Sequence, residues 1–282
     1  MNWLVEPLGY AFMVRALLAV VMVGTVSALV GTFVVLRGMA FFGDALAHTI
    51  LPGLAVGYLV NGRDREGLFW WALVTAIGAA LGIGAISRSS KVRDDTAIGV
   101  VFAGMFALGI ALISMVRSFS VDLTHFLFGD ILGVSNGDLW RIAIFGGLAG
   151  VVILAFLKEF TVLAFDPVLA ATLRLPTRLL ESLLLVLIAV TIVVSLQAVG
   201  VALMVALLVT PAATAYLLTR RLGHLMLLAV ALSVISGVVG LYMSYYLAVA
   251  SGAAIVLVST IFFGLAWVWS SFAAGQGKPA KT

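Results

Sequence analysis

Long apolar segments recur along nearly the whole chain and are separated by short polar stretches. The segments cover residues 12–36, 41–60, 68–86, 96–116, 139–157, 179–197, 199–219, 225–247 and 252–272. Because a hydrocarbon core about 30 Å thick is crossed by roughly 20 helical residues, each segment is long enough to span a membrane. The sixth and seventh segments meet at the stretch "AVG", which forms either a tight hairpin or one broken element. The pattern therefore predicts eight or nine transmembrane helices.

The segments are apolar without interruption, as in "ESLLLVLIAVTIVVSL" (181–196). This pattern excludes a membrane β-barrel, whose strands alternate polar and apolar residues. Of the 282 residues, 63% are hydrophobic and only 10% are charged, whereas a soluble domain carries roughly 25% charged residues. We therefore expect an all-α polytopic membrane protein in which residues 1–282 form a single transmembrane domain. Two glycine pairs, "GAALG" (78–82) and "GGLAG" (146–150), would allow close helix packing, within one subunit or at a dimer seam.

Basic residues gather in the connections that follow the odd-numbered segments. They are Arg37, the stretch "SRSSKVRDD" (87–95), Lys158 with "LRLPTR" (173–178), "RRLGH" (220–224), and Lys278 with Lys281. With nine segments these clusters share one side of the membrane, which the positive-inside rule makes cytoplasmic, and the N-terminus lies outside. The net charge of +4 is therefore explained by topology and does not indicate binding of nucleic acid. The absence of cysteine excludes thiolate metal sites.

The connection "SFSVDLTHFLFGDILGVSNGD" (118–138) is half apolar and too short to span the membrane. A re-entrant or interfacial segment fits, because irregular backbone at membrane depth must be covered by protein. Its polar residues are Asp122, His125, Asp130 and Asp138. Two interpretations stay open: these residues dock a soluble partner or briefly hold a cation, or they form a solvated acidic loop.

A second connection, "FDPVLAATLRLPTR" (165–178), carries the signals of a short helix. Asp166 is a favourable N-cap residue, and Pro167 stands at the first helical position. Pro176 is expected to end the helix, because a proline disfavours helical backbone in the residue before it. We therefore predict a stiff helix at about 166–175 on the cytoplasmic face.

The stretch "FFGDALAHTILPG" (41–53) places Asp44 and His48 inside an apolar segment. Counting from Arg37 at 1.5 Å per residue, they lie about 10 and 16 Å into the membrane. Residues four apart share one helix face, with Cβ atoms about 5–6 Å apart. Ionisable groups at this depth usually face a cavity, a partner or a permeant species. The pair suits a divalent transition metal or a proton relay, and a purely structural role is the alternative.

Signatures of catalysis are missing from the sequence. It contains neither Gly-x-Ser-x-Gly nor HExxH, and it has no phosphate-binding loop of the GxxxxGK[ST] type. We therefore expect that the protein is not an enzyme and that any ATP hydrolysis takes place on a separate subunit.

Five blocks in a fixed order resemble the zinc- and manganese-type ABC transporter permeases of bacteria. They are "LVGTFVVLRGMAFFGDALAHTILPG" (29–53), "DDTAIGVVFAGMFALGIALIS" (94–114), "LFGDILGVS" (127–135), "FDPVLAATLRLPT" (165–177) and "VGVALMVALLVTPAATAYLL" (199–218). The resemblance implies a homodimeric pore in the bacterial cytoplasmic membrane, with helices arranged as in vitamin B12-type importers. It also implies cytoplasmic ATPase subunits and an extracytoplasmic metal-binding protein as partners.

The resemblance also implies roles for particular residues. Asp44 and His48 would gate the pathway and contact the metal in transit. The coupling helix that fits the ATPase would comprise Asp166, Pro167, Val168, Leu169, Leu173 and Leu175. The cargo would be Zn²⁺ or Mn²⁺, with iron a further choice that the sequence does not decide. No cofactor would be bound permanently, and ATP would be held by the partner subunit.

The alternative is a proton- or ion-coupled secondary transporter that uses Asp44 and His48 as a relay. Such a transporter is expected to carry an internal inverted repeat and to need no ATPase. The sequence has no evident repeat, and the capped cytoplasmic helix would then lack a purpose. An intramembrane enzyme would need further catalytic groups at matching depth.

Overall fold

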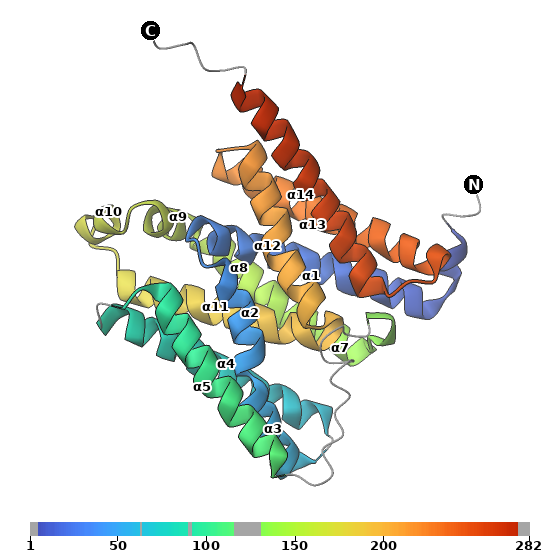
Figure 1. Ribbon diagram of the computed structural model, residues 1–282, viewed down its shortest axis with the longest axis horizontal. Coiled ribbons are helices and arrows are strands. Elements are labelled where there is room, and N and C mark those ends of the chain that lie inside the picture. Colours follow the sequence, from blue (N-terminus) through green and yellow to red (C-terminus); the bar gives the residue numbers. More distant parts are fainter. Residues whose placement is uncertain (1–4, 63, 90–91, 116–130, 276–282) are drawn as a thin grey trace.

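The computed structural model describes residues 5–62, 64–89, 92–115 and 131–275, and these ranges contain helices and no strand (Figure 1). The helices are η2 (Glu6–Gly9), α1 (Ala11–Leu36), α2 (Ala40–Thr49), α3 (Leu51–Asn61), α4 (Arg65–Ser89), α5 (Asp94–Ser114), η3 (Ile131–Gly133), α7 (Asn136–Arg141), η4 (Ile142–Gly146), α8 (Gly147–Ala155), α9 (Leu157–Phe165), α10 (Pro167–Thr172), α11 (Thr177–Val199), α12 (Val201–Leu218), α13 (Leu222–Leu247) and α14 (Ser251–Gly275).

Nine stretches in the described ranges are long and apolar enough to cross a membrane, so the higher of the two expected helix counts is confirmed. Each stretch coincides with one of the apolar segments in the sequence, within a few residues at either end. The sixth and seventh spans are separate helices joined by Gly200, whose φ is 79°. A left-handed residue is readily supplied by glycine, and it lets α12 leave α11 at an angle (Figure 1).

Two spans depart from a regular α-helix. The second span consists of α2 and α3, which meet at Ile50, and Pro52 stands in the first turn of α3. Because proline has no N–H, it cannot donate to the carbonyl of His48 four residues earlier, and the helix is interrupted there. The fifth span consists of α7, the π-helical turn η4 and α8.

The centre of the bundle is formed by α1 and α11, which α12, α13, α4 and α2 surround (Figure 1). In the most apolar stretch of each span, 67% of the residues are buried in α11 but only 17% in α5. Close packing depends on glycine at Gly31, where a Cβ atom would lie 1.8 Å from the carbonyl oxygen of Leu208. By contrast, a Cβ on Gly78 or Gly82 would meet open space. The expectation that this pair brings helices together within one subunit is therefore wrong.

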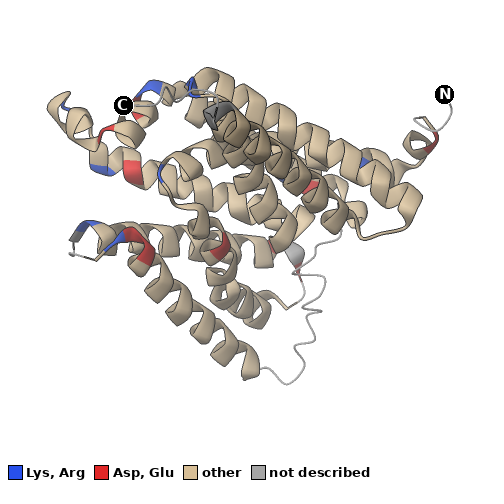
Figure 2. Cartoon of the chain, turned by 45° about the horizontal axis from the view of Figure 1, so that its top comes forward, with Lys and Arg blue, Asp and Glu red and all other residues tan. Residues whose placement is uncertain are grey.

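The charged residues mark the two ends of the bundle. Figure 2 shows Lys and Arg concentrated toward the end that carries α9, α10 and the starts of α5 and α11. Exposed tryptophans lie near the ends of the spans, with Trp70 and Trp140 at the opposite end and Trp267 and Trp269 in the last turns of α14. Tryptophan prefers the membrane–water interface, so this placement fits the expected membrane crossing. We refer to the end that carries α10 as the inner end and to the opposite one as the outer end.

The short helix α10 begins where it was predicted to begin. Asp166 is its N-cap, and the carboxylate accepts hydrogen bonds from the backbone N–H groups of Val168 (3.0 Å) and Leu169 (2.9 Å). The predicted end near residue 175 is wrong, because α10 ends at Thr172.

A Schellman motif ends α10 before the chain reaches Pro176. Arg174 adopts a left-handed conformation with φ of 57°. Its N–H donates to the carbonyl of Ala171 (3.0 Å), and that of Leu175 donates to the carbonyl of Ala170 (3.1 Å). These are the two bonds that define the motif. The chain therefore turns sharply between α10 and α11.

Candidate transport pathway and coupling helix

The helix α2 holds Asp44 and His48 on one face. The His48 Nε2 and Asp44 Oδ1 atoms are 3.8 Å apart, which is longer than a hydrogen bond. Their side chains are 21% and 42% exposed, respectively. In the described part of the chain neither side chain has a hydrogen bond, so their polar atoms remain free to meet a third group.

The imidazole of His48 is held by aromatic rings of α5. It meets Phe102 and Phe106 edge-on, with ring centroids 5.9 and 5.7 Å away. The two phenyl rings stack on one another at 5.8 Å. Packing against α5 therefore orients the imidazole while its nitrogens make no hydrogen bond.

The break after α2 places His48 in the last full turn of that helix. Pro52 cannot donate to the His48 backbone carbonyl, which instead accepts a hydrogen bond from the N–H of Ile50. No group of three or more His, Asp or Glu side chains that could hold a metal ion occurs in the described ranges. Within these ranges a single copy of the chain thus offers two neighbouring donor residues at this position, Asp44 and His48.

The helix α10 projects from the inner end of the bundle (Figure 1). Three apolar side chains of this region are exposed, Val168 by 73%, Leu169 by 46% and Leu173 by 57%. Ala170 is fully buried, and Leu175 packs against the core of the bundle. One side of the helix is therefore anchored to the permease, and the other presents apolar surface at the inner end.

Of the four polar residues predicted to act in the outer connection, the structure describes Asp138. Asp122, His125 and Asp130 lie outside the described residues. Asp138, grouped with them in the sequence, is only 9% exposed and forms a capping box with Ser135 at the start of α7. It is therefore neither solvated nor free to hold a cation, because its carboxylate is used to begin the fifth span.

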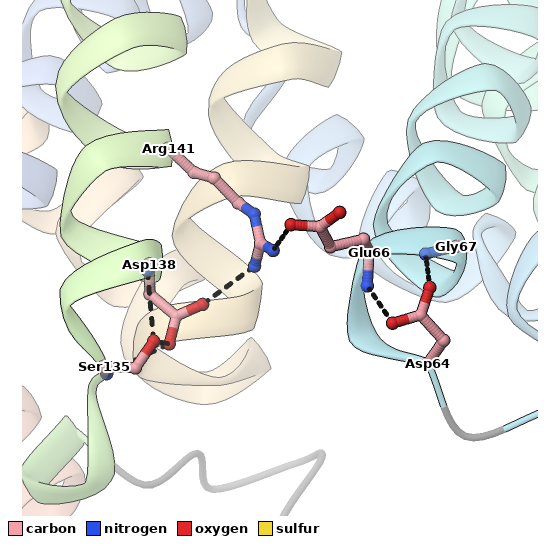
Figure 3. A network of polar contacts seen from close by, with 6 residues as sticks. All are labelled: Asp64, Glu66, Gly67, Ser135, Asp138 and Arg141. Atoms are coloured by element: carbon pink, nitrogen blue, oxygen red, sulfur yellow. Dashed lines mark hydrogen bonds and ion pairs between the residues drawn. The ribbon is translucent and has the colours of Figure 1, made fainter.

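Sequence patterns did not reveal a polar network at the outer end, shown in Figure 3. The Arg141 guanidinium donates to Asp138 Oδ1 (3.0 Å), pairs with Glu66 Oε1 (3.6 Å) and lies over the ring of Phe69. Asp64 accepts from the N–H groups of Glu66 and Gly67 and so caps α4. The network joins the outer start of α4 to that of α7. The spacing of Asp138 and Arg141, one helical turn apart, was the only signal of it in the sequence.

In the described ranges, the nine long apolar spans define a multi-pass helical membrane protein. The model of the ABC 3 transport family matches residues 9–270, and the chain belongs to this family. It is a multi-pass protein of the bacterial cytoplasmic membrane and a transport component rather than an enzyme.

Among similar proteins is the manganese transport system membrane protein MntC of Listeria innocua, 46% identical over 95% of this chain and 93% of the relative. The probable iron transport system membrane protein of Haemophilus influenzae is 37% identical over 95% of this chain and 97% of the relative.

Two solved structures are similar in fold. One, PsaBC from Streptococcus pneumoniae in complex with Fab, has a TM-score of 0.81 and 36% identity, and covers 94% of each chain. The other is an inward-facing conformation of a putative metal-chelate type ABC transporter. It has a TM-score of 0.72 over 91% of this chain and 85% of the other, and at 15% identity it supports the fold alone.

Proposed function

We propose that this chain is the permease subunit of an ATP-driven importer for a divalent transition metal ion, with Mn²⁺ or Fe²⁺ as cargo. The observation that carries the proposal is the Asp44–His48 pair, which lies within a membrane span and lacks a mutual hydrogen bond. Carboxylate and imidazole donors suit Mn²⁺ and Fe²⁺. The relatives named above carry manganese and iron in their names, which favours these ions over zinc.

A second copy of the chain would complete the pathway. The Asp44 carboxylate is 42% exposed within a membrane span, and such a group is costly against lipid. The span α5, which holds His48 in place, is the least buried of the nine in the described ranges. A homodimer that apposes these faces would cover Asp44 and bring two Asp–His pairs toward one passage. Four donors would contact the ion, while their division between two subunits would let it be released.

The inner end would receive the ATPase. A groove on a soluble subunit would cover the exposed Val168, Leu169 and Leu173, and the Asp166 cap would keep α10 stiff enough to transmit a push. ATP would be bound and hydrolysed by that subunit and would drive alternating access of the pathway. An extracytoplasmic binding protein would deliver the ion, and Asp122, His125 and Asp130, outside the described residues, are candidate contacts for it.

Transport measurements on two variants test the proposal. We expect His48→Ala and Asp44→Asn to lower ⁵⁴Mn uptake by roughly tenfold or more, since loss even of indirect partners of metal ligands costs 10–100-fold. The complex with the ATPase should still assemble, because both residues lie away from α10. The matched controls are His224→Ala and Asp95→Asn, the same substitutions at exposed positions.

Proteoliposomes distinguish the proposed importer from a secondary transporter. Uptake that requires ATP and the ATPase subunit supports the importer. Uptake driven by a proton gradient without ATP would contradict it and would favour a proton-relay role for Asp44 and His48. Unimpaired uptake by a well-expressed His48→Ala variant would remove the pair from the pathway.

A further inference from the structure

Three parts of the chain meet in a charged cluster at the inner end: the corner after α1, the end of α4 with the start of α5, and the start of α11. Arg37 Nη2 donates a hydrogen bond to Glu181 Oε1 at 3.3 Å. Arg88 Nη1 pairs with the other oxygen, Oε2, at 3.7 Å, and also donates to Ser182 Oγ at 3.3 Å. Nearby, Ser87 bonds to Asp94 at the start of α5. A single carboxylate on α11 therefore holds two guanidiniums, one at each oxygen.

The cluster borders a cavity of about 180 Å³. Its walls include the apolar residues Met39, Phe42, Ile83 and Leu185 besides the charged groups. The side chains of Arg37, Arg88 and Glu181 are 17%, 30% and 23% exposed, so the ion pairs are partly shielded from water. Unfilled space beside an ion-paired corner leaves room for that corner to shift without a steric clash.

The cluster lies between the two sites proposed above. Arg37 directly follows α1, and α2 begins three residues later, so this arginine marks the corner from which the helix of Asp44 and His48 departs. Gly38 makes this corner with φ of 68°. Glu181 lies in the second turn of α11, which follows α10 after the tight turn at 173–176. The Arg37–Glu181 contact therefore joins the element after α10 to the element before Asp44.

We propose that Glu181 is the positioning residue that couples displacement of α10 to reorientation of α2. It acts through Arg37, while Arg88 ties the inner end of α4 to the same carboxylate. When α10 moves, the stiff turn carries the start of α11 with it, and the Glu181 carboxylate pulls the Arg37 corner. This inference rests on the proposed roles of α10 as the ATPase contact and of α2 as the gate.

The test uses the full permease–ATPase complex reconstituted in proteoliposomes, with ATP hydrolysis and ⁵⁴Mn uptake measured together. Glu181→Gln keeps the shape of the side chain and removes its charge. We expect the ratio of uptake to ATP hydrolysed to fall by roughly 5- to 150-fold, the usual range of a coupling between two sites. Complex assembly and ATP hydrolysis should persist. The control is Glu159→Gln, the same substitution on a carboxylate of α9 for which the structure gives no ion pair.

A double-mutant cycle separates coupling from folding. Arg37→Gln should lower the ratio as Glu181→Gln does. The double variant should be no worse than Glu181→Gln alone, because both single changes remove the Arg37–Glu181 contact. An unchanged ratio in Glu181→Gln would overturn the inference. So would parallel loss of assembly, melting temperature and both activities in the two single variants, which indicates a structural role. If the parent complex shows no ATP-dependent uptake, the proposed function fails instead.

Discussion

The two ends of the bundle carry charged clusters of opposite design. At the outer end one guanidinium, Arg141, contacts two carboxylates, Asp138 and Glu66. At the inner end one carboxylate, Glu181, contacts two guanidiniums. The shortest Arg141–carboxylate contact joins residues three apart in one helix, whereas the Arg37–Glu181 hydrogen bond joins residues 144 positions apart.

This difference separates two uses of charge in a membrane protein. A local pair such as Asp138–Arg141 stabilises the start of one span and moves with it. A long-range contact such as Arg37–Glu181 fixes one span relative to another, so a movement of either span also displaces the other. The outer cluster is therefore expected to govern stability, and the inner cluster to govern the transmission of movement.

The largest effect is expected from a change on α10, the helix whose movement the inner cluster is proposed to transmit. Leu169→Glu places a charge on the apolar surface of α10, and burying that charge unpaired at the ATPase contact should cost several kcal/mol. Copurification of the ATPase, ATP hydrolysis and uptake should fall together, with Asp44 and His48 unchanged. Leu169→Met, which conserves volume, is the control and should keep all three. Retained copurification in Leu169→Glu would show that α10 is a packing element of the permease.

At the outer end the largest effect is expected from Asp138→Ala. It removes the capping box of α7 and leaves the half-buried Arg141 with the exposed Glu66 as its remaining carboxylate partner in the described ranges. The unfolding free energy in mixed micelles should therefore fall by about 3 kcal/mol. Ser135→Ala removes only the cap and should cost about 1 kcal/mol. Uptake per ATP should stay unchanged in the protein that folds. A selective loss of coupling without a loss of stability would reverse the roles of the two clusters.

The smallest effect is expected from Glu66→Gln. The Glu66 side chain is 77% exposed and lies 3.6 Å from Arg141, and exposed ion pairs contribute only about 0–1 kcal/mol. The unfolding free energy should therefore change by less than about 0.5 kcal/mol. Asp138→Asn in the same assay provides the comparison for a buried partner. A cost for Glu66→Gln equal to that of Asp138→Asn would mean that the link between α4 and α7 matters as much as the local pair.

Much of the fold was predictable because hydropathy acts locally. The membrane spans in the described ranges, the Asp166 cap of α10 and the shared face of Asp44 and His48 follow from the order of residues within one segment. The end of α10 was predicted wrongly at Pro176. The left-handed turn at Arg174 stops the helix first, and an arginine in that conformation gives no clear signal in the sequence.

The sequence by itself determined which segments cross the membrane, at which helix ends the basic residues gather and which helix carries the Asp–His pair. Only the tertiary structure decided that Gly31 rather than Gly78 permits close packing, that Phe102 and Phe106 orient His48, and that Glu181 holds Arg37 and Arg88. The reason is that helix formation depends on neighbours within a few residues. The partner of a buried charge is chosen by how whole helices pack, and no short stretch of sequence contains that information.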